Sequence, residues 1–155
     1  MKRILLFFTF SMFSLASTIA AGDKGELRFM EHADECLTIM SEAAKGMSIQ
    51  GVAVVAYIPG EKSSKWTSKM TVVGALSNDK ANYLAIAYSK AAEMAETLKN
   101  SSTALRKPLF GEFGYKGGMI QKVKNGYILT VFSGATGEQD AEVATKGLEW
   151  LAKKF

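Results

Sequence analysis

The sequence predicts an α+β domain in which three amphipathic helices cover a mainly antiparallel sheet. The first observation behind this prediction is the order of the hydrophobic patterns, which alternate between helical and strand periods as α-β-β-α-β-β-α. The second is a pair of short strand-to-strand connections. Because such connections join antiparallel neighbours, two hairpins indicate a mainly antiparallel sheet with helices packed on it.

Residues 1–22 are expected to be a secretory signal peptide that is not part of the fold. Lys2 and Arg3 precede an apolar stretch that is too short to span a bilayer comfortably. Small residues then place a cleavage site near Ala20 to Gly22. No cysteine adjoins this site, and no later segment is long and apolar enough to cross a membrane. We therefore expect a periplasmic or secreted protein without a stable membrane anchor.

Residues 23–155 are predicted to form a single domain, since this length supports one hydrophobic core. Without Lys2 and Arg3, 17 basic side chains face 15 acidic ones, which gives a net charge of +2. No long basic block is present, so nucleic acid is not an expected partner. Cys36 is the only cysteine, and an internal disulfide is therefore excluded. This thiol is either buried and inert or available for intermolecular chemistry.

The first half of the domain is predicted to be a helix followed by a hairpin. Residues 26–47 carry apolar side chains at helical spacing, namely Leu27, Met30, Ala33, Leu37, Met40, Ala44 and Met47. Residues 49–58 are nearly all apolar and rich in valine, which indicates a buried strand that ends at Pro59-Gly60. Residues 66–73 alternate between apolar and polar side chains and indicate a strand with one solvent-facing side.

The middle of the chain is predicted to be a helix, a long loop and a second hairpin. The helix covers residues 79–98, and its predicted buried stripe is Ala81, Leu84, Ala85, Tyr88, Ala91, Ala92, Ala95 and Leu98. Residues 104–118 form a long connection rich in glycine and aromatic residues, and such loops in compact domains are often functional. Asn125-Gly126 joins two apolar runs, which is the strongest short hairpin signal.

The last helix is predicted to begin at Thr136, which can form a capping box with Gln139. Glu138 and Asp140 suit the positive end of a helix. An anion at this helix start would meet both carboxylates. We therefore interpret the turn as structural, with Ser133-Gly134 placed to border a pocket.

These C-terminal motifs carry a resemblance to a known family. Gly117-Gly118-Met119-Ile120, the Asn-Gly hairpin, the turn from Ser133 to Asp140 and the alanine-rich last helix resemble the GlcG/HbpS-type haem-binding or haem-degrading domain family. Residues 87–91 are similar to the family's Ala-x-x-Lys-Ala pattern. The resemblance implies a profilin-like antiparallel sheet, a homo-oligomer, and haem or a related tetrapyrrole as the bound group.

Two groups of residues are candidates for ligand binding. His32 and Cys36 lie four residues apart on a helix and so share a face, where they could ligate a soft metal or haem iron. The alternative is a half-exposed histidine beside a buried thiol. The second group is Tyr115, Lys116, Gly117 and Gly118, which offers a lysine and main-chain amides to a propionate. The alternative for this second group is a loop that precedes a hairpin and whose glycines are needed only for the backbone conformation.

The sequence thus predicts an exported small-ligand-binding protein for haem, a related tetrapyrrole or another carboxylated ligand. His32 is the predicted metal ligand, and the predicted binding residues are His32, Tyr115, Lys116, Gly117, Gly118, Ser133 and Gly134. Two alternatives stay open. One is a haem-degrading or other small-molecule-transforming enzyme. The other is a non-catalytic oligomeric interaction or sensor-accessory protein.

Overall fold

A computed structural model describes residues 24–155, and the predicted signal peptide lies outside these described residues. The elements follow the predicted order, and the α+β fold is confirmed. Within the described residues, none of the helices combines the length and the apolar composition needed to cross a bilayer. The elements are α1 (Lys24–Gly46), β1 (Gly51–Pro59), β2 (Thr67–Val73), α2 (Tyr83–Thr97), β3 (Gly118–Val123), β4 (Gly126–Ser133) and α3 (Gly137–Ala152).

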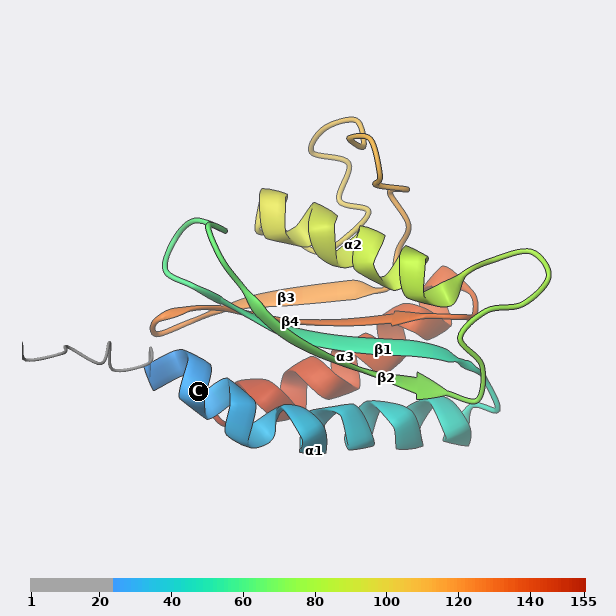
Figure 1. Ribbon diagram of the computed structural model, residues 1–155, viewed down its shortest axis with the longest axis horizontal. Coiled ribbons are helices and arrows are strands. Elements are labelled where there is room, and N and C mark those ends of the chain that lie inside the picture. Colours follow the sequence, from blue (N-terminus) through green and yellow to red (C-terminus); the bar gives the residue numbers. More distant parts are fainter. Residues whose placement is uncertain (1–23) are drawn as a thin grey trace, which may run out of the picture.

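The four strands form one antiparallel sheet in the order β2-β1-β4-β3. Each predicted hairpin contributes one edge strand and one central strand, and the two hairpins meet at the β1–β4 pair. Val54 at the middle of β1 therefore pairs with Met70 on one side and with Val131 on the other. Figure 1 shows α2 on one face of this sheet and α1 with α3 on the opposite face.

The sheet separates two apolar clusters. The α1/α3 cluster includes Phe29, Met40 and Phe132, whereas the α2 cluster includes Val54 and Met94. Successive side chains of β1 enter the two clusters alternately, because side chains of a strand point to opposite faces. This double burial explains why the strand lacks the polar alternation of a half-exposed strand. Each fully buried large apolar side chain contributes about 1.5–3 kcal/mol to the free energy of burial.

The buried face of α1 differs from the predicted stripe near its start. Leu27 and Met30 were expected in the core but are 61% and 42% exposed. Phe29 and Cys36 are buried instead. The ring of Phe29 stacks on Tyr57 with centroids 6.4 Å apart, and burying this larger aromatic side chain turns the first helical turns away from the predicted face.

The buried face of α2 agrees with the predicted stripe in part, since Ala91 is buried and the α2 cluster is contacted by Leu84, Tyr88, Ala95 and Leu98. Ala85 and Ala92 are exposed, whereas Ala87, Lys90 and Met94 are buried. The prediction considered apolar residues only and therefore did not include Lys90, which lies on the face of α2 toward the sheet. A lysine thus lies in the layer between α2 and the sheet.

Candidate functional site

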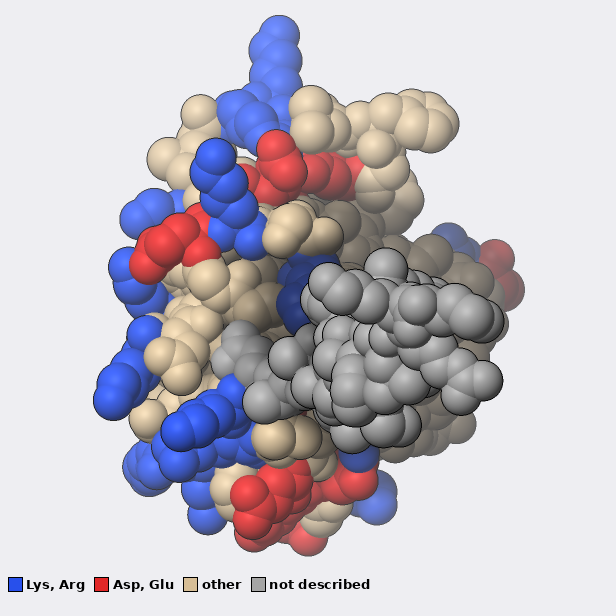
Figure 2. Space-filling view, turned by 60° about the vertical axis from the view of Figure 1, so that its left-hand side comes forward, with Lys and Arg blue, Asp and Glu red and all other residues tan. Residues whose placement is uncertain are grey.

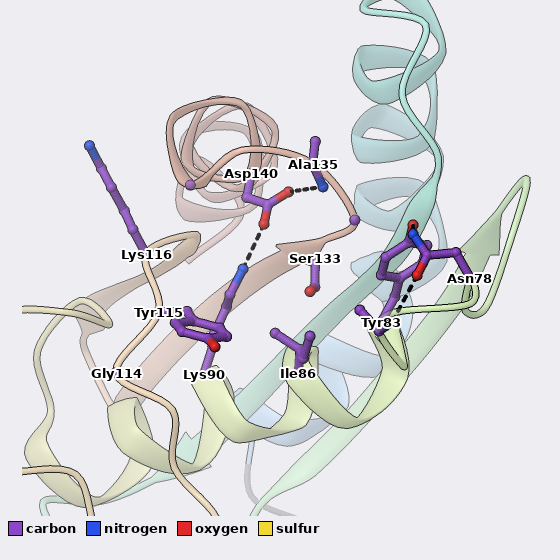
Figure 3. Close-up of a pocket in the computed structure, with 13 residues that line it drawn as sticks. Asn78, Tyr83, Ile86, Lys90, Gly114, Tyr115, Lys116, Ser133, Ala135 and Asp140 are labelled. Carbon is purple, nitrogen blue, oxygen red and sulfur yellow. Dashed lines mark hydrogen bonds and ion pairs between the residues drawn. The ribbon is translucent and has the colours of Figure 1, made fainter.

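A pocket of about 480 Å³ lies where β4 ends, between the first turns of α2 and α3 (Figure 3). Its walls come from residues 78–86 before and within α2, from Lys90, from residues 114–116 of the long loop and from residues 133–140 after β4. Pockets that bind small molecules measure about 300–1,000 Å³. The size and the convergence of separate segments make this the candidate site.

The turn between β4 and α3 forms the back of the pocket. Gly134 passes so close to the chain before β1 that a Cβ atom here would lie 2.0 Å from the carbonyl oxygen of Gln50. Thr136 then caps α3 and accepts a hydrogen bond from the Gln139 amide, which confirms the predicted capping box. The Ala135 amide donates to a carboxylate of the first helical turn at 3.0 Å. Main-chain donors of this turn therefore already bind within the protein.

That carboxylate belongs to Asp140, which forms a buried ion pair with Lys90. The Lys90 Nζ atom lies 2.7 Å from Asp140 Oδ2 and also donates to the carbonyl oxygen of Phe132 at 2.8 Å. The two residues are 2% and 3% exposed. Because these three residues belong to α2, α3 and β4, the pair connects both helical layers to the end of one central strand. Figure 3 shows both contacts of Asp140, to Lys90 and to Ala135.

Burial and pairing act on this pair in opposite directions. Burial lowers the pKa of Lys90, while the charge of Asp140 and its hydrogen bond oppose that shift. Burial likewise raises the pKa of Asp140, and Lys90 together with the amides of Ala135 and Gly134 opposes this shift. Each charged form thus depends on its partner, and the pair as a whole is electrically neutral.

Gly117 allows the long loop to pass against the ion pair. Its φ is +124°, and a Cβ atom here would lie 2.6 Å from Lys90 Nζ and 2.5 Å from Asp140 Cβ. Its carbonyl oxygen accepts a hydrogen bond from the Phe132 amide at 3.0 Å, so the loop is fixed to β4 just before β3 begins. Gly118 has a different environment, since it is buried beside Met94, away from the pocket lining.

Tyr115 and Lys116 lie at the mouth of the pocket. Tyr115 is 53% exposed, and its ring stacks on Phe113 with centroids 5.5 Å apart. Its hydroxyl makes no hydrogen bond with residues 24–155. Lys116 extends outward from the rim in Figure 3, and its Nζ atom lies 3.4 Å from a carboxylate oxygen of Glu138. The mouth therefore offers one flat aromatic surface and one accessible cation.

Ser133 lies at the floor of the pocket. The residue is 2% exposed, and Figure 3 shows its side chain directed into the space between Lys90 and Ile86. Its hydroxyl forms no hydrogen bond within the described part of the chain, although it lines the pocket. Tyr83 differs in this respect, because its hydroxyl accepts a hydrogen bond from Asn78 at 2.7 Å. Within residues 24–155, the fully buried side-chain oxygen or nitrogen without a hydrogen-bond partner is Glu93 Oε2. The Ser133 hydroxyl is therefore open to the pocket, where it can bind a ligand atom or a water molecule.

His32 and Cys36 lie elsewhere, on α1 at the opposite face of the sheet. The His32 ring packs edge-on against Trp150 with centroids 6.2 Å apart and does not line the pocket. Cys36 is fully buried, donates to the carbonyl oxygen of Gly147 at 3.4 Å, and has its pKa raised by burial to about 12. Between residues 24 and 155, the His, Cys, Asp and Glu side chains form no group of three or more that could hold a metal ion.

The structure thus brings together part of the predicted set. Tyr115 and Lys116 meet Ser133 and Gly134 in one pocket, while Gly117 packs behind it. Sequence reasoning missed the ion pair at the floor. A signal was present, because Lys90 lies three residues after Ala87 and four before Met94, at the spacing of a buried stripe.

The surface outside the pocket carries mixed charge. Figure 2 shows Lys and Arg side chains interspersed with Asp and Glu on the face it presents. Individual pairs include Lys69 with Asp34 at 2.8 Å and Lys122 with Glu61 at 2.9 Å. Exposed pairs of this kind contribute little to stability, but they neutralise basic side chains locally.

A scan against protein-family models and a search of the curated proteins found no match to this chain. The pocket is distinguished by the buried ion pair, by a Ser133 hydroxyl that makes no hydrogen bond with residues 24–155, and by the cationic aromatic mouth.

Proposed function

We propose that this protein is an exported small-ligand-binding protein of the GlcG/HbpS type, which takes haem, a related tetrapyrrole or another flat carboxylated ligand in the pocket. One observation carries this proposal. Tyr115 and Lys116 come from the long loop and Ser133 and Gly134 from the end of β4, yet all four line the same cavity.

The mouth fits a flat acid. The exposed ring of Tyr115 offers a stacking surface to a planar ligand, since aromatic pairs favour offset or edge-to-face contact. Lys116 is 54% exposed at its side chain and can donate a charge-assisted hydrogen bond to a carboxylate such as a propionate. Glu138 competes for this lysine at 3.4 Å, so ligand binding exchanges one carboxylate for another.

Haem would also need a ligand for its iron. Histidine, cysteine, methionine and tyrosine all serve as axial haem ligands. The pocket is lined by two residues of these types, Tyr83 and Tyr115. Tyr83 already binds Asn78, whereas the Tyr115 hydroxyl makes no hydrogen bond within residues 24–155. Tyr115 is therefore the residue that fits an iron-binding role in this pocket; in that role its phenol oxygen would face the iron, and its ring would not stack on the porphyrin.

The predicted role of His32 is a separate hypothesis. His32 lies on the other face of the sheet, beside Trp150, so it cannot ligate a haem held at the mouth described above. A haem bound through His32 would occupy a different surface. Because the two sites share no residue, substitutions distinguish them cleanly.

The test compares hemin with metal-free protoporphyrin IX, which keeps both propionates but lacks the iron. Titrations followed by absorption and fluorescence are expected to show saturable binding of both. Lys116→Ala should weaken the two ligands by a similar factor of up to about tenfold, because it removes a contact to the carboxylate. Glu138→Gln should strengthen both, since it frees Lys116. Tyr115→Phe should alter the hemin Soret band and leave protoporphyrin binding nearly unchanged.

His32→Ala is the control variant for this pocket, and it should leave both titrations unchanged. A Soret spectrum that responds to His32→Ala but not to Tyr115→Phe would move the haem site to α1. The proposal would be contradicted if neither tetrapyrrole showed saturable binding, or if the Lys116 and Glu138 substitutions left both affinities unchanged.

A further inference from the structure

The floor of the pocket has unused hydrogen-bonding capacity. The Lys90 ammonium group carries three N–H donors, and two of them bind Asp140 and Phe132. No third acceptor for Nζ lies among residues 24–155. The Ser133 hydroxyl, which also lines the pocket, likewise makes no hydrogen bond within the described residues. Two hydrogen-bond donors from different elements thus line one pocket, where both can bind a ligand oxygen.

The charge of this region selects the kind of group that can bind. Asp140 lines the same pocket and neutralises Lys90 at 2.7 Å. A ligand carboxylate placed here would meet an anion next to the lysine and would leave a net negative charge away from water, which is strongly unfavourable. A carbonyl or hydroxyl oxygen can accept from Lys90 and Ser133 without adding charge.

The mouth has the opposite preference. Lys116 is accessible and, within residues 24–155, its ammonium group pairs with the exposed carboxylate of Glu138, at 3.4 Å. A ligand carboxylate is therefore favoured at the rim, whereas a neutral oxygen is favoured at the floor. The two ends of the pocket differ in the chemistry that they accept.

We infer that Lys90 and Ser133 form a subsite for a neutral carbonyl or hydroxyl oxygen, so that the ligand is a planar acid with its carboxylate at the rim and such an oxygen at its buried end. Asp140 acts as a positioning residue that holds Lys90. The inference rests on the proposed function and narrows it, among the carboxylated ligands named there, to oxo-acids, hydroxy-acids and linear tetrapyrroles with a terminal lactam carbonyl. Haem carries no such oxygen and would leave this subsite unused.

Three benzoates with the same ring and different far ends test this inference. 4-Acetylbenzoate carries a ketone, 4-ethylbenzoate replaces that ketone by an ethyl group, and terephthalate places a second carboxylate there. Binding is measured by NMR titration, with the amides of Gly134 and Ala135 as reporters of the floor. We expect wild-type protein to bind 4-acetylbenzoate at least about tenfold more tightly than either other acid, since only the ketone pairs both donors without added charge.

Variants separate the floor from the mouth. Ser133→Ala removes one hydrogen-bond partner without changing any charge, and it should reduce the preference for the ketone while leaving 4-ethylbenzoate affinity unchanged. The double variant Lys90→Met/Asp140→Asn removes both buried charges together and should also reduce the preference, because only the Ser133 hydroxyl then remains to bind the ketone. Lys116→Ala should weaken all three acids by a similar factor, because each carries a carboxylate at the rim.

Equal affinities for the three acids in the wild type, tighter binding of terephthalate, or a ketone preference that survives Ser133→Ala and the double variant would overturn the inference. If none of the three acids binds while protoporphyrin IX does, the subsite is refuted and the proposed function stands. If protoporphyrin IX and hemin also fail to bind, both are refuted.

Discussion

Replacing Lys90 by methionine is expected to be one of the most damaging single substitutions in this protein. The change keeps most of the side-chain volume but leaves the Asp140 carboxylate, 3% exposed, without its partner at 2.7 Å. Two main-chain amides, of Ala135 and Gly134, still bind this carboxylate. Breaking a buried ion pair on one side costs about 3–5 kcal/mol, because the remaining charge is desolvated without compensation. For a domain of this size the melting temperature should fall by about 10–20 °C.

Urea and thermal unfolding of Lys90→Met measure this loss, and pH identifies its cause. Without Lys90, burial raises the pKa of Asp140 still further above its unfolded value. A carboxyl group with a raised folded-state pKa favours the folded state at low pH and loses that contribution as pH rises through the folded pKa. The difference in the free energy of unfolding between wild type and Lys90→Met should therefore be smallest at acidic pH and increase toward neutral pH.

The double variant Lys90→Met/Asp140→Asn is the matched control. It removes both charges and leaves an amide oxygen that can still accept from Ala135, so most of the stability should return. A loss below about 1 kcal/mol for Lys90→Met, a deficit that does not change with pH, or a double variant no more stable than the single one would refute this reasoning.

Three further predictions concern other parts of the fold. Gly117→Ala places a Cβ atom 2.6 Å from Lys90 Nζ at a φ of +124°, and urea unfolding should show a loss of at least about 1–3 kcal/mol; an unchanged midpoint would contradict this. Burial raises the pKa of Cys36 from 9.0 to about 12. As pH rises between these values, the free energy of unfolding of wild type should fall by up to about 1.4 kcal/mol per pH unit relative to Cys36→Ala. Unfolding free energies of the two proteins that change in parallel with pH would contradict this prediction. The Leu109 amide donates to the Glu112 carboxylate at 2.8 Å, so Glu112→Gln should speed hydrogen exchange at this amide. Equal exchange rates in the two proteins would show that other contacts hold the loop.

The sequence predicted the order of the elements because each one has a local signal. The valine-rich run gave β1, the Asn-Gly pair gave the β3–β4 hairpin, and Thr136 marked the start of α3. Helix faces were less predictable where tertiary contacts decide them. α2 begins only at Tyr83, because Asn82 caps it by accepting a hydrogen bond from the third helical amide, and the preceding residues form a turn.

The site was predictable only in its outer part. Tyr115 and Lys116 stand out in a glycine-rich loop, and such composition is visible in the sequence. The floor depends on two charged residues, 50 positions apart, that become acceptable in the interior only because each neutralises the other. Counting apolar residues treats Lys90 as solvent-facing, and the partner that reverses this conclusion, Asp140, lies beyond any local window.

The Lys90–Asp140 ion pair lies at the end of β4 and directly connects the helical layers on the two faces of the sheet. One partner belongs to the helix over the α2 cluster, and the other to a helix of the α1/α3 cluster. The two apolar clusters should therefore melt cooperatively instead of in succession. A ligand that contacts this ion pair would stabilise both helical layers together, so its binding would also reduce local unfolding in α1.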